Sequence, residues 1–303
     1  MPPRTLASLA QSLSVATDVE GALTALAESL AELDRFALTK MGQYLRSDHP
    51  RSLQARVLFN SEVLWPIWGT LLNTIRSGNS GAVQAFGMPF YDYLHLHPEI
   101  AKVFDRTMAD AIRYRVEPAL ASYDFSRFRK IVDIGGGNGT LMLAILQRWP
   151  HLEGVVFDLP SVAERARQSF GDTAAGVRCV VQSGNALEGV PEGADCYVMS
   201  NFLNSVGDEE AGTLLRNCRK AMAVDGTVVI IEWVVPKAEE GADPFTRWDT
   251  ASMDLNMLAI HGRGGWRVRT SDEFRLLIQE AGFVLNKIIP TKSSVSVLEC
   301  VAG

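Results

Sequence analysis

Residues 131–139 read IVDIGGGNG, and this stretch decides the fold. A short apolar run ends in glycines, and a helical pattern over residues 139–149 follows it. Glycine permits positive φ and lets the backbone approach a ligand closely, while the N-terminus of the next helix offers free N–H groups. The stretch therefore predicts a strand, a ligand-binding loop and a helix in succession.

Further apolar runs alternate with helical patterns along the rest of the chain. The runs cover residues 155–157, 177–181, 196–199, 228–233, 283–289 and 295–301, and the helical patterns cover residues 161–169, 209–223 and 271–281. This alternation predicts an α/β fold with a parallel sheet, right-handed crossovers and helices on both faces. The last two runs lie close together with Pro290 between them, which predicts an antiparallel C-terminal hairpin at or near the sheet edge.

The first part of the chain predicts helices instead. Leucine and alanine recur at helical spacing over residues 4–33, residues 35–39 look extended, and Thr39 is positioned to cap the next turn. This order is similar to a winged helix with a structural or dimerising role. Residues 52–122 continue as amphipathic helix, with most of their aromatic side chains expected in a core. We expect an N-terminal domain at 1–122 and a catalytic domain at 123–303.

Composition narrows the function without choosing one. The chain has 303 residues, 47% hydrophobic and 21% charged, and a formal net charge of -6, so it is globular and has no positive field for nucleic acid. The four cysteines have no metal-binding spacing and predict reduced core thiols in a cytoplasmic protein. No apolar stretch is long enough to predict a membrane span, and the N-terminus lacks the layout of a signal peptide.

The glycine spacing distinguishes two classes of cofactor. A dinucleotide motif, G-x-G-x-x-G, needs glycine where Thr140 stands, whereas the observed D-x-G-x-G-x-G resembles motif I of class I methyltransferases that use S-adenosylmethionine. Asp158 ends the next apolar run, 19 residues after Gly139. A carboxylate there can accept both ribose hydroxyls of a cofactor, and its alternative role is to cap the next helix.

Six motifs together are similar to the plant and bacterial small-molecule O-methyltransferases of the caffeate and hydroxyneurosporene type. In order they are IVDIGGGNG (131–139), GVVFDLPSV (154–162), VPEGADCYVMSNFLNSVGDEEA (190–211), LLRNCRKAM (214–222), DLNML (254–258) and LIQEAGF (277–283). The resemblance covers nearly the whole chain. It implies a Rossmann-like sheet, S-adenosylmethionine as cofactor, a small-molecule acceptor and a homodimer.

The resemblance also implies site residues. For the cofactor these are Asp133, Gly135, Gly137, Gly139, Asp158, Leu159, Gly184, Asn185, Ala186 and Ser200. For the acceptor they are Phe104, Met108, Met257, His261 and Trp266. No metal ligand set is expected.

The chain departs from the family pattern where the chemistry is expected. The family's general base is a histidine, and alignment on Leu203 and Asp208 places Asn204 there. Val268 stands near the position of the glutamate that orients that histidine, so base and orienter are lost together. Ser200 replaces a lysine of the cofactor pocket, and Asn185 replaces an acid that contacts adenine.

Asparagine cannot act as a base near neutral pH, and losing a general base typically costs ~10²–10⁴-fold in rate. We therefore expect an acceptor that is already nucleophilic, or a replacement base. His261 is the best replacement, since it follows Met257 by four residues and shares its face if the segment is helical. His95 and His97 fit surface or packing roles better. Arg263 or Arg267 can meet an acidic substrate, whereas Arg269 fits a structural role.

Three functions remain open from the residues. The first is methyl transfer to a small aromatic or polyketide-like secondary metabolite, driven by proximity, with Asn204 and His261 as the catalytic residues. The second keeps the cofactor and catalyses a non-methylating reaction (pericyclic, decarboxylative or hydroxylating), with the sulfonium as an electrostatic aid. The third is a non-enzymatic regulator built on the N-terminal region, against which the acidic charge balance argues.

Overall fold

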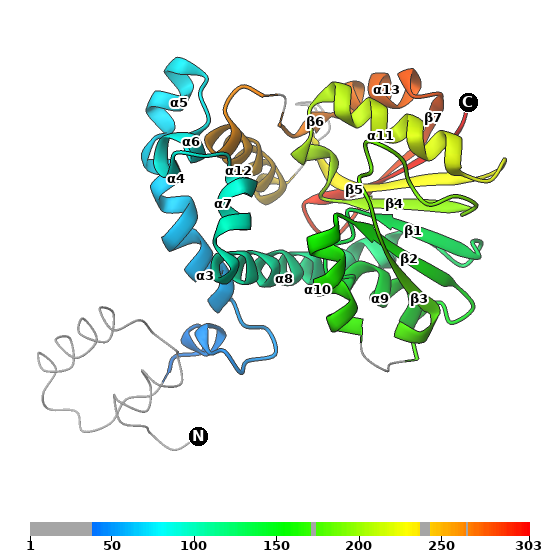
Figure 1. Ribbon diagram of the computed structural model, residues 1–303, viewed down its shortest axis with the longest axis horizontal. Coiled ribbons are helices and arrows are strands. Elements are labelled where there is room, and N and C mark those ends of the chain that lie inside the picture. The colour runs from blue at the N-terminus through cyan, green and yellow to red at the C-terminus, as the bar shows by residue number, and fades with distance from the viewer. Residues whose placement is uncertain (1–37, 171–173, 237–242, 265) are drawn as a thin grey trace, which may run out of the picture.

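In the computed structural model, an open sheet lies beside a mostly helical part (Figure 1). Residues 38–170, 174–236, 243–264 and 266–303 are described. The predicted helices at 4–33, and with them most of the predicted winged helix, lie outside these ranges. Thr39 does cap the turn that follows it, because its Oγ1 accepts a hydrogen bond from the Gly42 N–H at 3.0 Å, at the start of η1 (Gly42–Leu45).

Eight strands form the sheet in the order β3-β2-β1-β4-β5-β8-β7, with β6 paired to β5. They are β1 (Lys130–Ile134), β2 (Glu153–Asp158), β3 (Cys179–Ser183), β4 (Cys196–Ser200), β5 (Thr227–Val235), β6 (Arg269–Thr270), β7 (Phe283–Pro290) and β8 (Val295–Ala302). Strands β1 to β5 run parallel, and β8 pairs antiparallel with both β5 and β7. The predicted α/β fold and antiparallel C-terminal hairpin are confirmed.

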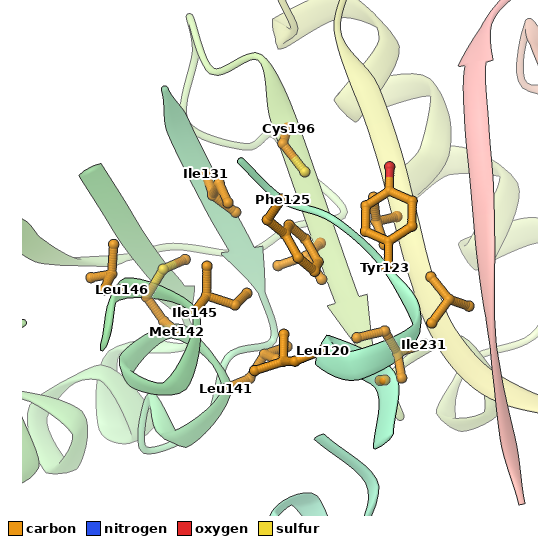
Figure 2. Close-up of a cluster of buried hydrophobic side chains, with 14 of the residues drawn as sticks. Leu120, Tyr123, Phe125, Ile131, Leu141, Met142, Ile145, Leu146, Cys196 and Ile231 are labelled. Carbon is orange, nitrogen blue, oxygen red and sulfur yellow. The ribbon is translucent and has the colours of Figure 1, made fainter. Parts of the chain in front are cut away.

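Both faces of the sheet are covered, because its strands are apolar on both sides. Ile131 packs on one face with Leu141 and Met142 (Figure 2), whereas Val132 and Ile134 pack on the other. The covering elements are α9 (Thr140–Arg148), α10 (Pro160–Phe170), η3 (Gly176–Arg178), η4 (Leu203–Ser205), α11 (Asp208–Ala221) and α13 (Ser271–Glu280).

Short helices and one long one make up the helical part, as the amphipathic pattern predicts. They are α3 (Gln54–Phe59), η2 (Asn60–Leu64), α4 (Trp65–Gly69), α5 (Leu71–Ser77), α6 (Gly81–Phe86), α7 (Phe90–Leu96) and α8 (Pro98–Ser122). Helix α8 reaches from this part to the sheet, where Leu120 joins the core of the sheet (Figures 1 and 2).

A helix that the sequence did not predict joins the two parts. Helix α12 (Pro244–His261) comes from the second half of the chain but packs against α4, α5 and α6, and also against β5. Met257 and Ile260 share a buried cluster with Phe59 and Phe90. The division of the chain into domains at 122/123 stays a prediction. Helix α12 belongs to the second of these segments but packs against helices of the first.

The end of α12 is held in place by backbone contacts. Gly262 ends the helix at φ +73°, and a Cβ there would lie 2.4 Å from the Gly78 oxygen, so only glycine fits. The Arg263 N–H donates to that same oxygen at 2.9 Å, and Ser80 Oγ donates to the Ile260 oxygen at 2.6 Å. These contacts fix the last turn of α12, which carries His261.

Candidate cofactor and acceptor site

The glycine loop after β1 leaves room for a ligand at one position. Gly135, Gly137 and Gly139 have φ values of +67°, +58° and +79°. A Cβ would lie 2.8 Å from the Phe202 ring at Gly135 and 2.3 Å from the Phe170 ring at Gly139. At Gly137 no heavy atom lies within 4 Å of that point, so the loop backbone is open to close approach there.

Two carboxyl groups flank this loop. Asp133 is buried, and its Oδ2 has no hydrogen-bond partner among the described residues. Burial, and then the charge of Asp158, raise the pKa of Asp133 well above its usual range. Asp158 accepts hydrogen bonds from the N–H groups of Gly137 at 2.9 Å and Leu159 at 2.7 Å. Neither bond is to the second or third N–H of α10, so Asp158 is not a helix cap.

The remaining predicted cofactor residues lie at the same edge of the sheet. The Gly184 N–H donates to the backbone carbonyl oxygen of Asp158 at 3.0 Å, and Asn185 donates through Nδ2 to Glu188 Oε1 at 3.0 Å. Asn217 of α11 anchors the segment by donating to the carbonyl oxygens of Ala186 and Leu187. Ser200 is the last residue of β4. Ligands of open α/β sheets bind at this carboxyl edge.

These residues fit S-adenosylmethionine. The open backbone at Gly137 admits a ligand, and the unpartnered Asp133 oxygen and the Asp158 carboxyl group can accept hydrogen bonds from an ammonium or from ribose hydroxyls. The exposed side chain of Leu159 offers an apolar surface next to Asp158.

Asn204 is buried just beyond the end of β4. Its Oδ1 accepts a hydrogen bond from Ser205 Oγ at 2.9 Å, while its Nδ2 has no partner among the residues described. Asn201, the first residue after β4, has a φ of +54° and an Oδ1 that also lacks a partner in the described part of the chain. The buried Nδ2 of Asn204 can therefore donate a hydrogen bond to an acceptor atom of a ligand.

A carboxyl group that the sequence analysis missed lies against Asn204. The backbone N–H of Asn204 lies 3.4 Å from Oε1 of Glu232, and Oε2 of Glu232 has no partner within the described ranges. Burial raises the pKa of Glu232 to about 7, against the opposing effects of the Asn204 N–H, Arg269 and Arg115. The available signal was a single acid inside the apolar run 228–233.

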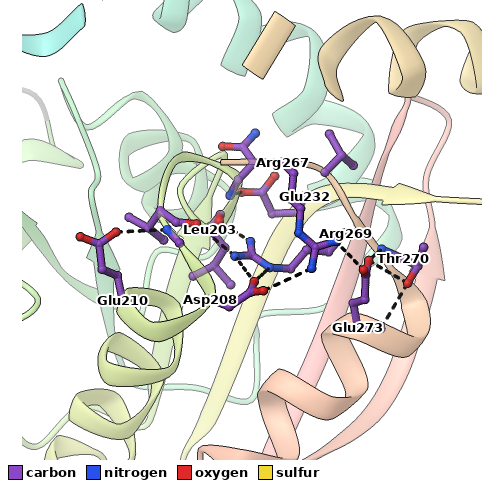
Figure 3. A network of polar contacts seen from close by, with 12 residues as sticks. Leu203, Asp208, Glu210, Glu232, Arg267, Arg269, Thr270 and Glu273 are labelled. Carbon is purple, nitrogen blue, oxygen red and sulfur yellow. Dashed lines mark hydrogen bonds and ion pairs between the residues drawn. The ribbon is translucent and has the colours of Figure 1, made fainter. Parts of the chain in front are cut away.

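Arg269 holds the segment that carries Asn204 (Figure 3). Its buried guanidinium donates to the carbonyl oxygens of Leu203 and Val206, which flank Asn204, and to Asp208 Oδ1 at 2.8 Å. Arg267 forms ion pairs with Glu273 and Asp208. Arg269 therefore has the structural role that its sequence context predicts.

His261 lies in an aromatic cluster. Its ring stacks on Trp266 with centroids 3.7 Å apart, and Tyr91 lies near both rings at 6.1 and 5.9 Å. Burial lowers the pKa of His261 to about 4, so the imidazole is neutral near pH 7. This shift weakens His261 as a base and suits it to a wall of the acceptor site.

Tyr91 connects this cluster to Asn204, which the sequence analysis did not foresee. Burial raises the pKa of Tyr91, whereas a hydrogen bond with the Ser205 side chain lowers it, so the phenol lies close to the neighbour of Asn204. The residue as a whole is 46% exposed, so the burial that raises this pKa concerns the phenol group and not the entire residue. No signal in the sequence separates Tyr91 from the buried Phe90 beside it.

The other predicted acceptor residues lie partly in this cluster. Phe104 contacts the rings of Phe90 at 5.7 Å and Tyr91 at 6.5 Å, and Met257 packs in the buried apolar cluster that contains Phe90 and against which Phe104 packs. Met108 lies one turn further along α8 and is half-buried. His95 and His97 are exposed.

The described residues contain no group of three or more His, Cys, Asp or Glu side chains that could hold a metal ion. Within the same ranges, no helix combines the length and apolar character that crossing a membrane requires. All four cysteines are free thiols.

Comparison with known proteins shows the family of this chain. Residues 68–284 match the O-methyltransferase domain family. The phenazine O-methyltransferase PhzM of Lysobacter antibioticus is 34% identical over 264 residues, which cover 87% of this chain and 75% of that protein. The aclacinomycin 10-hydroxylase RdmB of Streptomyces purpurascens is 32% identical over 249 residues, covering 82% of this chain and 65% of that one.

Solved structures are similar to this chain over nearly its whole length. The crystal structure of LaPhzM has a TM-score of 0.87 at 31% identity and covers 99% of this chain and 90% of its own. CalO1, a methyltransferase in calicheamicin biosynthesis with S-adenosylhomocysteine bound, has a TM-score of 0.76 at 28% identity and covers 99% and 88%.

Proposed function

Because this chain belongs to the O-methyltransferase domain family, we propose that it methylates a small secondary-metabolite acceptor without a histidine base. It is a methyltransferase whose cofactor is S-adenosylmethionine. When bound, this cofactor supplies an electrophilic methyl group on a sulfonium. The residues that would hold it are the loop from Gly135 to Gly139, Asp158, the segment from Gly184 to Ala186, and Ser200.

One observation carries the proposal: Asn204 is buried and presents an Nδ2 that no described residue satisfies. Leaving a buried donor unpaired costs about 1–3 kcal/mol, so the position favours a ligand that accepts its hydrogen bond. We assign Asn204 to orienting the acceptor. Positioning alone can supply a large part of the rate when the attacking atom is already nucleophilic.

Glu232 is the group we assign to proton exchange. A carboxyl group with a pKa of about 7 is matched to general base work near neutral pH, and its Oε2 has no partner within the described ranges. His261, with a pKa of about 4, holds a proton poorly at that pH. We therefore place His261 in the acceptor site as a neutral aromatic surface beside Trp266, with Phe104, Met108 and Met257 completing the apolar lining.

The aromatic character of this lining favours an aromatic or polyketide-like acceptor, because flat rings stack on Tyr91, His261 and Trp266. We also propose a cytoplasmic homodimer that does not bind nucleic acid. The net charge of -6 argues against a nucleic-acid partner, and large exposed apolar side chains on the helical part, such as Trp65 at 80% and Leu72 at 60% exposed, favour a second subunit.

A second candidate is a non-methylating reaction that keeps the cofactor. The missing histidine base and the similarity to a hydroxylase, RdmB, favour it. For a pericyclic or decarboxylative reaction, the missing histidine base is the supporting observation.

The two candidates differ in the fate of the cofactor's methyl group. The purified protein is incubated with methyl-labelled S-adenosylmethionine and a metabolite extract of its source organism, and small molecules are followed by mass spectrometry. Label in a product, with an equal amount of S-adenosylhomocysteine, supports methyl transfer. A metabolite that is consumed without label or S-adenosylhomocysteine overturns methyl transfer and supports the second candidate.

A further inference from the structure

Arg115 lies on the face of α8 that carries the predicted acceptor residues. It follows Phe104 by eleven residues and Met108 by seven, and these spacings place the three side chains on one side of a helix. Seven residues span about 10 Å of helix, so Arg115 lies beyond the aromatic cluster, toward the sheet. An arginine on an otherwise apolar helix face needs an explanation.

The guanidinium of Arg115 rests on a tryptophan rather than against an acid. Its Cζ lies 4.0 Å from the ring centroid of Trp233, which is in β5. Trp233 in turn donates through Nε1 to Asp249 Oδ2 at 3.0 Å. None of the described acids forms an ion pair with Arg115, and no described oxygen accepts a hydrogen bond from it. A stacked guanidinium keeps its N–H groups free at its edge.

A second arginine adds to this positive charge. Burial, followed by the charge of Arg56 in α3, lowers the pKa of Arg115 to about 10, so Arg115 stays charged near pH 7. Asp249 and Glu232 attract Arg115 from a distance, but Asp249 already accepts the Trp233 N–H. Two arginines thus lie near each other between the helical part and the sheet, and none of the described carboxylates forms an ion pair with Arg115.

A second polar group without a partner among the described residues lies in α12. Thr250 is buried in α12, and its Oγ1 has no partner in the described part of the chain. It precedes Met257 by seven residues and His261 by eleven, which is the spacing that Arg115 shows on α8. Each of the two helices therefore carries predicted acceptor residues and, seven residues from the nearest of them, a polar group without a hydrogen-bond partner among the described residues.

We propose that Arg115, supported by Arg56 and Thr250, binds an anionic oxygen group of the acceptor, so that the acceptor is a carboxylate or a similar small anion. This rests on the proposed function of the same site. A guanidinium can hold a carboxylate through two parallel hydrogen bonds, which gives orientation as well as affinity. The sequence assigned an acidic substrate to Arg263 or Arg267 instead. Arg267 is already paired with Glu273 and Asp208, and Arg263 donates to the Ile75 oxygen at 3.1 Å.

The test compares pairs of probes that differ only in charge. Calorimetric titration of the protein, saturated with S-adenosylhomocysteine, uses benzoate and 1-naphthoate against benzamide and 1-naphthamide. We expect at least one acid to bind about tenfold more tightly than its amide. Arg115→Met should abolish this preference and leave amide binding unchanged, whereas Arg115→Lys should keep part of it.

Arg148 offers a matched control. It lies over Trp149 with its Cζ 5.2 Å from the ring centroid, on the exposed end of α9. Arg148→Met removes the same contact elsewhere and should leave the preference intact. If Arg115→Met does not fold, the same titrations are carried out with Arg56→Met. This variant should bind the acid more weakly and the amide equally well.

Three outcomes overturn the proposal. The first is that the unaltered protein does not bind either acid more tightly than its amide, or binds no acid at all. The second is that Arg115→Met weakens the binding of acid and amide equally, and the third is that this variant loses affinity for S-adenosylhomocysteine. The last would assign the anion to the cofactor's own carboxylate. Failure of the unaltered protein to bind S-adenosylhomocysteine would instead overturn the proposed function, so the two failures are distinguishable.

Discussion

Asn204 lies over Glu232, with its backbone N–H 3.4 Å from Oε1 of that carboxyl group. Each of the two side chains keeps one polar atom, Nδ2 of Asn204 and Oε2 of Glu232, without a partner among the described residues. Asn204 stands where the family resemblance predicts a histidine base, so the place of that base is taken by an amide that cannot titrate next to an acid that can.

The first prediction concerns the stability cost of Glu232. Its pKa rises from 4.5 to about 7 on folding, so the native state binds more protons between these values and stability falls as pH rises through them. The loss is on the order of 3 kcal/mol, complete above about pH 7 and absent below about pH 4.5. Glu232→Gln should remove it, so the variant should gain stability over the unaltered protein as pH rises. Urea unfolding at pH 5 and pH 8 measures this, and an equal difference at both pH values would contradict it.

The same variant tests catalysis. If Glu232 exchanges the acceptor's proton, Glu232→Gln should lower kcat by about 10²-fold or more and abolish a pH dependence centred near 7. Turnover is followed as S-adenosylhomocysteine formation across pH 5.5–9. An unchanged pH profile would leave Glu232 with a purely structural role.

His261 is predicted to act as a surface and not as a base. Since its pKa is about 4, it protonates only at acidic pH, and His261→Phe keeps a ring against Trp266. We expect kcat to change less than about tenfold, with an unaltered pH profile. A fall in kcat of ~10²–10⁴-fold would show instead that His261 acts as the base. Trp266→Ala, which removes the stacking partner, should raise KM more than it lowers kcat.

Gly137 is predicted to matter because of the space beside it. Gly137→Ala should weaken S-adenosylhomocysteine binding by tenfold or more, because the new methyl group enters the space that a ligand needs. Gly193→Ala is the control, since Gly193 also has a positive φ, of +77°, and no heavy atom within 4 Å of its added Cβ. Both variants carry similar backbone strain, about 1–2 kcal/mol, so comparable losses of affinity would indicate strain and not blocked approach.

Replacing Arg269 is predicted to lower the stability of the protein much more than replacing Arg267. Arg269→Met removes a buried cation that serves two carbonyl oxygens and Asp208, so unfolding free energy should fall by about 3 kcal/mol. Arg267→Met removes partly exposed ion pairs and should cost about 1 kcal/mol or less. Chemical denaturation measures both, and equal costs would show that Arg269 does not hold the segment around Asn204.

The sequence predicted the sheet and its covering helices closely, because their signals are local. Strand β1 was expected at 131–134 and spans 130–134, and α13 was expected at 271–281 and spans 271–280. Helix α12 was missed since it packs on the helical part and also on β5, so its apolar residues do not gather on one stripe. The prediction of a ligand-binding loop at residues 135–139 also came from local information, the glycine spacing, and the structure places this loop directly after β1.

By itself, the sequence determined most strands of the sheet and the helices that cover it, the place of the glycine loop after β1, and that residue 204 is not a histidine. These follow from the period of apolar residues, from the freedom of glycine at positive φ and from the identity of residue 204, all of which act within a few residues. Only the tertiary structure decided what surrounds Asn204 and Arg115. Glu232, Tyr91 and Trp233 reach them from segments tens or more than a hundred residues away, and burial there shifts pKa values and leaves donors unpaired. Such contacts depend on how the whole chain packs, which no local pattern encodes.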